Sequence, residues 1–413
     1  MLMKRVVITG LGVISPVGND INTYWNNLKN GVCGIGEITQ YDTKDMPVKL
    51  AAEVKNFKVE DFDVEKGMAR RSDRFCQFAL AAAAEAMNDS GLQGKIAPER
   101  LGVYVGSGIG GINTFKNECE KMFNEGPGRI SPLLIPMMIS NIASGNIAIA
   151  HKAEGPCLPV VTACATSTHA IGEAYRAIKF GYADAIISGG AESAINPLAV
   201  GGFTNCKALS KSNDPLAASL PFDARRAGFV MGEGAGIVVL EEYEHAVNRC
   251  AKIYAEVCGY ANTCDAYHYT APSPEGTCAA RAIKYALDEA GFNASDLLYI
   301  NAHGTGTPLN DKSETKAIKL ALGEQEARRA LISSSKSMTA HTLGAAGGME
   351  IIVSALSLQE GIVTPTIGLH EPDPECDLNY TPNKAVKADL TIALSNSLGF
   401  GGHNGCVALR KFK

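Results

Sequence analysis

The sequence contains a long internal repeat, which limits the possible folds more than any other feature. The segment EAMNDSGL ends a predicted helix at Gly91, and a polar stretch and a predicted strand then lead to Gly106. The segment YALDEAGF ends a second predicted helix at Gly291, and the same order of elements leads to Gly304. The paired glycines are offset by 200 and 198 residues. A repeat of this length indicates duplication of a whole domain rather than a solenoid of short units.

Predicted strands and helices alternate in both halves of the chain, which is typical of an α/β fold. We expect an N-terminal half at residues 1–250 and a C-terminal half at residues 251–413. Strands are predicted at residues 5–9, 101–105, 160–162, 185–188, 236–240, 253–257, 298–301, 331–334, 391–395 and 406–409. Helices are predicted at residues 75–89, 113–124, 136–152, 277–290 and over much of 344–360, with one more ending at Gly181.

Composition and charge exclude several classes of protein. The net charge is −5, so no global basic field argues for nucleic acid as a partner. No stretch approaches about 18 unbroken apolar residues, so we expect no membrane span. The N-terminal apolar run is interrupted by Gly10, Gly12 and Pro16 and has no clear cleavage site, so it does not resemble a signal peptide. The 12 cysteines form no CxxC pair, which argues against zinc and favours a reducing compartment, the cytoplasm.

Cys164 is the strongest candidate for a nucleophile. An apolar β-branched run ends at Thr162, and a helical pattern follows, so Cys164 lies at a sharp turn between strand and helix. Ser167 or Thr168 can cap this helix. The unpaired N–H groups and the dipole at a helix N-terminus favour the thiolate and can hold an oxyanion. The alternative is a small buried hydrophobic residue, which is how free cysteines usually behave.

Two histidine motifs in the C-terminal half are candidate partners. His303 follows a predicted buried strand in NAHGTGTPLND, and His341 lies in SSSKSMTAHTLGAAGG, five residues after Lys336. Either histidine alone is more often a hydrogen-bonded structural group. Small residues surround both, so a substrate can approach them closely. With Cys164 they supply one thiol and two imidazoles, which suit acyl-transfer chemistry.

A third motif, GSGIGG, has the glycine spacing of a dinucleotide-binding site. Gly106, Gly108 and Gly111 follow a predicted strand with GxGxxG spacing. No convincing βαβ unit with an acidic ribose ligand follows, so we reject a Rossmann site.

These motifs together resemble the β-ketoacyl-[acyl carrier protein] synthases, and most of all their elongating members, the type II synthases. The resemblance rests on TACATSTHA around Cys164, NAHGTGTPLND around His303, KSMTAHTLGAAG around Lys336 and His341, and GFGGHNG at residues 399–405. It covers nearly the whole chain and implies a duplicated thiolase-like fold, a five-layer αβαβα sandwich. Two histidines distinguish the chain from the initiating synthases, which use Cys-His-Asn. Ala340 departs from the glycine that relatives usually have there, and we expect it to tighten the local backbone.

The resemblance also implies a reaction and a role for each site residue. Cys164 takes an acyl chain from its carrier, and a malonyl carrier is then decarboxylated and condensed with it to give a 3-oxoacyl carrier. His303 and His341 stabilise the enolate, Lys336 supports them, and the N–H groups of Cys164 and Phe400 hold the oxyanion. The substrates carry phosphopantetheine, so no cofactor is required. Further implied site residues are Ile109 and Phe203 in the acyl pocket, Thr305 and Thr307 on the pantetheine arm, Gly401 and Gly402 beside Phe400, and the supporting Asp311 and Glu314.

Three further features are implied by the resemblance. Arg70, Arg71, Arg129 and Lys207 are expected to form a basic patch that docks an acidic acyl carrier protein. The chain is expected to be a homodimer in which Leu134 or Met138 reaches the acyl pocket of the partner subunit. Asn301, Glu350, Ser395 and Asn396 match a site for a structural monovalent cation in relatives.

Two alternative functions stay open at this point. The chain can be a ketosynthase of a polyketide or specialised lipid pathway, since substrate choice depends on pocket shape. It can also be a non-catalytic subunit of the chain-length-factor kind, although such subunits lack the nucleophile that Cys164 supplies.

Overall fold

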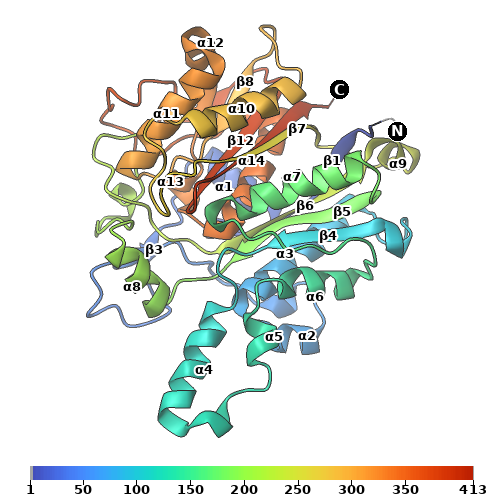
Figure 1. The fold of residues 1–413 in the computed structure, drawn as a ribbon, viewed down its shortest axis with the longest axis vertical. Coiled ribbons are helices and arrows are strands. Elements are labelled where there is room, and N and C mark those ends of the chain that lie inside the picture. Colours follow the sequence, from blue (N-terminus) through green and yellow to red (C-terminus); the bar gives the residue numbers. More distant parts are fainter. Residues whose placement is uncertain (1–2, 413) are drawn as a thin grey trace.

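The computed structural model describes residues 3–412 and is built around a mixed nine-stranded sheet, with strand order β4-β5-β6-β1-β7-β13-β12-β8-β9 (Figure 1). Its strands are β1 (Val6–Ile14), β4 (Leu101–Gly106), β5 (Ala185–Glu192), β6 (Gly234–Glu242), β7 (Ala255–Cys264), β8 (Leu298–Asn301), β9 (Leu331–Ser333), β12 (Ile392–Gly399) and β13 (His403–Lys411). Two small hairpin-like pairs join β2 (Gly36–Glu37) to β3 (Leu50–Ala51) and β10 (Ile362–Val363) to β11 (Val386–Lys387).

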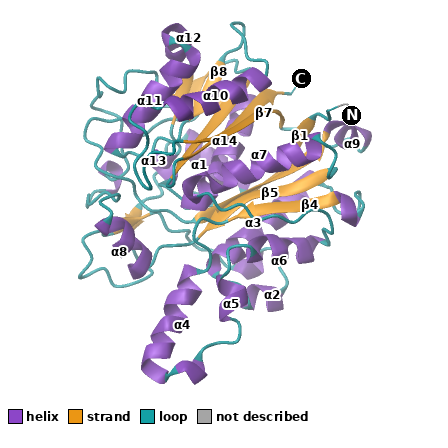
Figure 2. Cartoon of the chain, in the orientation of Figure 1, coloured by secondary structure: helices purple, strands orange, loops and turns teal. Residues whose placement is uncertain are grey.

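Helices cover both faces of this sheet (Figure 2). Those of the first part of the chain are α1 (Ile21–Lys29), α2 (Lys66–Arg70), α3 (Arg74–Ser90), α4 (Ile112–Glu125), α5 (Leu134–Met138), α6 (Ile142–His151), α7 (Thr166–Lys179), α8 (Pro197–Asn205) and α9 (Tyr243–Asn248). Those of the second part are α10 (Thr277–Glu289), α11 (Pro308–Leu322), α12 (Glu324–Arg329), α13 (Lys336–Thr339) and α14 (Ala346–Glu360). Among residues 3–412, no helix combines the length and apolar character that crossing a membrane requires.

The five expected layers are confirmed. Helices α3 and α6 cover the outer face of the strands β4, β5, β6 and β1, and α10 covers the outer face of β7 and β13. Helices α7 and α14 lie between the two groups of strands and contact both of them, as Figure 1 shows for α7. The two groups meet at a short antiparallel pairing of β1 with β7, in which Val6 faces Val257. Because α7 and α14 form the central layer, the residues directly before them, Cys164 and Ala165 before α7 and Leu343–Ala345 before α14, are buried.

The two groups of strands have the same order of elements, as the sequence repeat predicts. In the first, β4 and β5 are parallel, and β6 and β1 follow antiparallel. In the second, β8 and β12 are parallel, and β13 and β7 follow antiparallel. The equivalent outer helices α3 and α10 end at Gly91 and Gly291, whose φ angles of +57° and +65° favour glycine.

Glycines on the first strand of each group bring the outer helix close. A Cβ on Gly12 of β1 would lie 1.9 Å from the carbonyl oxygen of Ala82 in α3. A Cβ on Gly259 of β7 would lie 2.0 Å from the carbonyl oxygen of Ala286 in α10. The same packing device therefore occurs in both groups, which explains why alanine-rich helices lie over glycine-containing strands.

Three local predictions are wrong. Residues 160–162 form no strand, because this segment pairs with the edge strand β4 only through an isolated bridge between Cys157 and Val103. The predicted helix 136–152 is two helices, α5 and α6, interrupted at residues 139–141. Ser167 and Thr168 do not cap α7, and their hydroxyl groups bind the C-terminal half of the chain instead.

These hydroxyl groups join the two central helices to each other and to the sheet. Ser167 Oγ accepts a hydrogen bond of 2.8 Å from the backbone N–H of Gly348 in α14. Thr168 Oγ1 lies 2.7 Å from Ser397 Oγ on β12. A Cβ on Gly347 would lie 1.9 Å from Thr168 Oγ1 and 2.8 Å from the Thr168 backbone nitrogen. The crossing of α7 and α14 therefore leaves no room for a side chain at position 347.

We expect Gly347→Ala to lower the free energy of unfolding by about 2 kcal/mol, because the added methyl group overpacks this crossing. The matched control is Gly145→Ala in α6, where an added Cβ meets nothing within 4 Å. The control should raise the free energy of unfolding by about 0.5–1 kcal/mol, since alanine favours the helix. Urea denaturation measures both, and equal stabilities of the two variants would contradict the tight crossing.

Candidate active site

The central helices α7 and α14 begin in the same unusual way. A 3-10 turn, Ala163–Ala165, precedes α7, and its first residue has a φ of +51°. A second 3-10 turn, Leu343–Ala345, precedes α14, and its first residue has a φ of +49°. The two turns contact each other. Cys164 is the middle residue of the first turn, and His341 lies two residues before the second, so duplication brings both side chains to one place.

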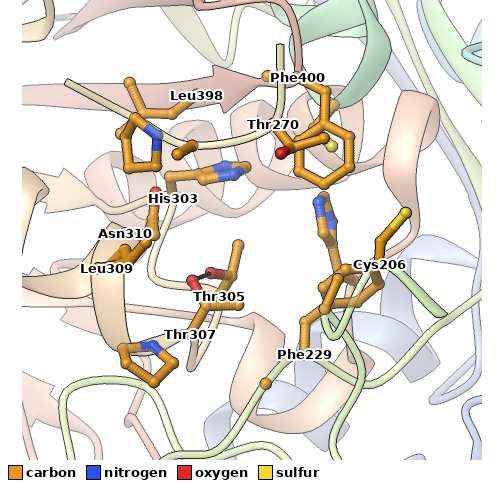
Figure 3. A pocket seen from close by; sticks show the side chains of 18 of the residues that line it. Cys206, Phe229, Thr270, His303, Thr305, Thr307, Leu309, Asn310, Leu398 and Phe400 are labelled. Carbon is orange, nitrogen blue, oxygen red and sulfur yellow. Dashed lines mark hydrogen bonds between the residues drawn. The ribbon is translucent and has the colours of Figure 1, made fainter. Parts of the chain in front are cut away.

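A cavity of about 330 Å³ opens from this place to the surface. Cys164, His303 and His341 line it, so the structure brings the three predicted reactive groups to one space. Figure 3 shows the labelled side chains of His303, Thr305 and Thr307 on one side of this space and those of Phe400, Phe229 and Cys206 on the other. The predicted residues Phe203, Thr305, Thr307, Lys207, Phe400 and Gly402 also line it.

The two imidazoles are close, buried and neutral. Their ring centroids are 5.3 Å apart, and the rings are nearly perpendicular at 87°. Burial and the Lys336 ammonium lower the pKa of His303 and of His341 well below the usual value. Among the described residues, His303 Nδ1 and both ring nitrogens of His341 have no hydrogen-bond partner. Buried polar atoms of this kind are available to a ligand.

Buried carboxylates hold the loop that carries His303. Glu314 on α11 accepts hydrogen bonds of 2.7 Å and 2.8 Å from the backbone N–H groups of His303 and Gly304. Burial raises the pKa of Glu314 to about 7. Asp311 accepts hydrogen bonds of 2.8 Å from the Phe222 N–H and 3.3 Å from the Gly306 N–H. These two residues support the loop through its backbone and do not line the cavity.

Lys336 is almost completely buried and forms an ion pair with Glu350. Burial raises the pKa of Glu350 to about 7, although the Lys336 ammonium opposes this shift. The charge of Lys336 reaches all three reactive groups, since it lowers the pKa of both imidazoles and of Cys164. The structure gives Lys336 no direct hydrogen bond to either histidine, so its support is electrostatic.

Burial opposes the thiolate character that the sequence predicts for Cys164. Burial raises the pKa of the Cys164 thiol to about 11, because desolvation of a thiolate outweighs the favourable groups around it. Those groups are the Lys336 ammonium and the backbone N–H groups of Phe400 and of Cys164 itself. The same two N–H groups were expected to form the oxyanion hole, and their convergence on the sulfur fits that expectation.

Phe400 belongs to an aromatic wall on one side of the cavity. Its ring centroid is 6.2 Å from that of Phe203, which is 5.5 Å from that of Phe229. The Phe229 ring in turn lies 5.2 Å from the His341 ring. After Phe400, Gly401 and Gly402 have φ angles of +88° and +79°, conformations that favour glycine. The chain thus turns sharply beside Phe400.

Some predicted residues lie away from the cavity. Ile109 is 37% exposed and does not line it, and Gly401 does not line it either. Of the four basic residues, only Lys207 lies at the cavity, after the end of α8. Arg70 and Arg71 end α2, and Arg129 lies in the turn beyond α4, where it pairs with Glu125. Figure 1 shows α2 and α8 well apart, so Arg70 and Arg71 do not lie beside Lys207 on a single chain.

The four residues matched to a cation site divide into two sets. Both side-chain polar atoms of Asn301, Ser395 Oγ and Glu350 Oε2 are buried and have no hydrogen-bond partner among the described residues. Asn301 and Ser395 are paired on neighbouring strands, so their side chains share one face of the sheet. Asn396 points to the other face, where its amide contacts Glu314 and Cys406. Asn301, Ser395 and Glu350 therefore each have a buried side-chain oxygen without a partner among the described residues, whereas the Asn396 side chain has partners.

The sequence analysis missed the rim formed by residues 265–272. Asp265, Thr270, Ala271 and Pro272 line the cavity. The Tyr269 carbonyl accepts a 2.8 Å hydrogen bond from the Gly401 N–H, and the Asp265 N–H donates one of 2.9 Å to the Gly402 carbonyl. The rim is a polar and aromatic segment that directly follows β7, and the predicted strand at residues 253–257 ended too early to show that it is a loop at the end of a strand.

Ala340, the departure from the usual glycine, has a φ of +56° and a ψ of −169°. Residues other than glycine rarely adopt this conformation, and it costs about 1–3 kcal/mol. Ala340 is completely buried, and His341 directly follows it. The expected local tightening is therefore backbone strain next to a reactive group.

We expect Ala340→Gly to raise the free energy of unfolding by about 1 kcal/mol. Relief of strain should exceed the losses from the buried methyl group and from the more flexible unfolded chain. Ala330 is also buried but has an ordinary φ of −63°, so Ala330→Gly is a matched control that should destabilise. Thermal unfolding of both variants measures this, and destabilisation of Ala340→Gly by as much as the control would contradict the strain.

Comparisons with known proteins agree with this geometry. Residues 3–246 match the family model "Beta-ketoacyl synthase, N-terminal domain", and residues 254–370 match "Beta-ketoacyl synthase, C-terminal domain". The chain is 51% identical over 411 residues to a 3-oxoacyl-[acyl-carrier-protein] synthase 2 of Staphylococcus aureus, covering 99% of each. It is 50% identical over 412 residues to the synthase 2 of a Synechocystis species, also covering 99% of each. A solved type II PKS ketosynthase, bound to a hexaketide and in complex with its acyl-carrier protein, superposes with a TM-score of 0.90 at 35% identity, covering 99% of this chain and 100% of that one.

Proposed function

The chain belongs to the beta-ketoacyl synthase family, and on that basis we propose that it is an elongating 3-oxoacyl-[acyl carrier protein] synthase of fatty acid synthesis. The observation that carries the proposal is the single cavity lined by Cys164, His303 and His341. One thiol and two neutral imidazoles suit a two-step condensation, and no cofactor is required for either step. The 51% identity to a synthase 2 supports elongation over the polyketide alternative, for which the structural relative is 35% identical.

In the first step, Cys164 Sγ attacks the thioester carbonyl of an acyl carrier. The tetrahedral oxyanion is held by the N–H groups of Cys164 and Phe400, and the carbon–sulfur bond to pantetheine then breaks. The thiol proton of Cys164 ends on the departing pantetheine sulfur. Burial raises the pKa of Cys164 to about 11, and the Lys336 ammonium lowers it and so favours the thiolate that attacks.

In the second step, malonyl carrier enters and loses carbon dioxide. The electron pair of the broken carbon–carbon bond becomes an enolate, whose oxygen accepts hydrogen bonds from the N–H groups of His303 and His341. The enolate carbon attacks the acyl carbonyl, and Cys164 leaves as the 3-oxoacyl carrier forms. Neutral imidazoles suit this role, since each keeps one N–H to donate, and the nearby Lys336 keeps both neutral.

Cys164→Ala should abolish acyl-enzyme formation while leaving the fold intact, because alanine fills most of the same buried space. Intact-mass spectrometry after incubation with an acyl carrier measures the adduct. The wild-type protein is expected to gain the mass of one acyl group, and the variant none. A stable adduct on another cysteine of the variant would remove Cys164 from this role.

His303→Ala and His341→Ala should each reduce release of carbon dioxide from malonyl carrier about 100-fold or more, and acylation of Cys164 much less. The reason is that acylation depends on the thiol and the oxyanion hole, whereas the enolate depends on both imidazole donors. Labelled carbon dioxide and acyl-adduct mass report the two steps separately. Normal carbon dioxide release by either variant would exclude that histidine from decarboxylation.

We further propose that Lys207 docks the acidic carrier protein at the mouth of the cavity. We propose that Arg70, Arg71 and Arg129 contact a carrier that is bound at the cavity of a second subunit. Lys207→Glu should weaken carrier binding about tenfold at low salt and less at high salt, because exposed charge pairs are screened. Lys95→Glu, an exposed lysine outside the cavity lining, is the charge-matched control. Equal affinities of the two variants at low salt would place the docking site elsewhere.

We propose a homodimer formed through the face that carries α5, α6 and the edge strand β4. Exposed apolar side chains gather there: Ile135 is 59% exposed, Ile149 68%, and Leu158, beside β4, 48%. Apolar groups of this size are seldom left in water on a monomer. Leu134 and Met138 are half-buried and lie on α5, as Ile135 does. We propose that they reach the acyl pocket of the partner subunit from there. Ile109, which is 37% exposed, is proposed to line that pocket once the partner covers it.

A structural monovalent cation is proposed near Asn301, Ser395 and Glu350, whose unpartnered oxygens support it. Such an ion would satisfy buried polar atoms and add positive charge beside the Lys336–Glu350 pair, without taking part in the reaction.

Residues 1–250 and 251–413 are proposed to be duplicated halves, and the repeated strand order supports this division. We propose the cytoplasm as the compartment.

A further inference from the structure

A buried glutamate that has no part in the proposed reaction lies next to the site. Glu192 is the last residue of β5 and has no exposed surface. Its Oε1 accepts hydrogen bonds of 2.7 Å from Ser107 Oγ and 3.2 Å from the Ile109 N–H. Its Oε2 accepts hydrogen bonds of 2.8 Å from the Gly108 N–H and 3.1 Å from the Gly344 N–H. One carboxylate therefore joins the loop after β4 to the turn that begins α14.

The four donors suit an ionised carboxylate. Burial raises the pKa of Glu192, and its hydrogen bonds oppose that shift. Among residues 3–412, no lysine, arginine or histidine forms a salt bridge with it. Three of the donors are backbone N–H groups, which have no lone pair with which to accept a carboxyl proton. The negative charge is thus held by the chain itself rather than by a cationic side chain, and it raises the pKa of Cys164.

The same place is tightly packed around glycines. A Cβ on Gly108 would lie 2.8 Å from Glu192 Oε2 and 3.4 Å from the carbonyl oxygen of Ala163. A Cβ on Gly344 would lie 2.4 Å from the Gly108 nitrogen and 2.8 Å from Glu192 Oε2. Residues 107–109, the Cys164 turn and the Gly344 turn therefore meet around one carboxylate.

We infer that Glu192 is a positioning residue that fixes the Cys164 turn, the loop 107–109 and the turn after His341 relative to one another. The inference rests on the proposed function for its kinetic consequence. The nucleophile comes from the N-terminal half and His341 from the C-terminal half, and Glu192 is hydrogen-bonded to both halves between them. If the separation of these turns changes, the distance between the enolate carbon and the acyl carbonyl carbon on Cys164 also changes, and the condensation slows.

Glu192→Gln tests this role. The carboxamide keeps one acceptor oxygen but turns an NH₂ group toward backbone N–H donors, so at least one of the three backbone hydrogen bonds is lost, whereas the Ser107 hydroxyl can rotate to accept from the NH₂ group. We expect kcat for condensation to fall about tenfold or more, and KM for the carrier to stay within about twofold, because the docking surface is unchanged. Loss of the negative charge should also lower the pKa of Cys164, so that iodoacetamide alkylates Cys164 about threefold faster at pH 9.

The control variant is Glu85→Gln. Glu85 also accepts hydrogen bonds from two backbone N–H groups, those of Val13 and Ile21, but it lies on the outer helix α3. The Glu85→Gln variant should have the same kcat and the same alkylation rate of Cys164 as the wild-type protein. Equal losses of kcat in the two variants would show only a general loss of stability and would overturn the inference. A wild-type kcat, or a wild-type alkylation rate, in Glu192→Gln would overturn it as well.

If Glu192→Gln does not fold, Ser107→Ala decides the question. It removes one donor to the carboxylate and should lower kcat about threefold with KM unchanged. A wild-type kcat in a folded Ser107→Ala protein would overturn the inference. Failure of the proposed function can be told apart from failure of this inference. A wild-type protein without condensation activity would refute the proposed function, and the alkylation rates of Cys164 would still test the role of Glu192.

Discussion

The site depends on the close crossing of two central helices. Helices α7 and α14 contact each other without a side chain at Gly347, and Ser167 and Thr168 bind the opposite half of the chain through their hydroxyl groups. This crossing sets the preceding turns side by side, so Cys164 and His341 face one cavity. Duplication explains the arrangement, because each half contributes one central helix with the same kind of turn at its start. The packing of the two central helices thus brings together two proposed catalytic residues that are 177 positions apart in the sequence.

Burial controls the charges in this site. It raises the pKa of Cys164 to about 11 and lowers the pKa of both imidazoles, so the free site holds a thiol and two neutral rings. Lys336 is a buried cation near the reactive groups, and its charge favours the Cys164 thiolate while it lowers the pKa of both histidines. A single ammonium group therefore supports both steps of the proposed reaction. The Glu192 carboxylate opposes this effect at the nucleophile, because its negative charge raises the pKa of Cys164.

The sequence alone predicted those features of the fold that depend on local residue patterns and on the internal repeat. Helix ends at Gly91 and Gly291 were predictable because left-handed glycines end helices. The meeting of Cys164 with His303 and His341 was predictable from their motifs. Features set by contacts between distant segments were not predictable. Residues 160–162 lack a strand partner, Ser167 and Thr168 bind across the helix crossing, and the thiol is more deeply buried than its place at a helix start suggested. The expected patch of basic residues also depends on such contacts, and the fold separates α2 from α8.

The most direct measurement of the central claim is the mass of the product made from one acyl carrier and malonyl carrier. The wild-type protein should convert a pre-formed acyl-Cys164 enzyme and malonyl carrier into a 3-oxoacyl carrier two carbons longer than the acyl chain supplied, with one carbon dioxide released for each product. Transfer of the acyl chain back to a free carrier, with no carbon–carbon bond formed and malonyl carrier left intact, would contradict the account.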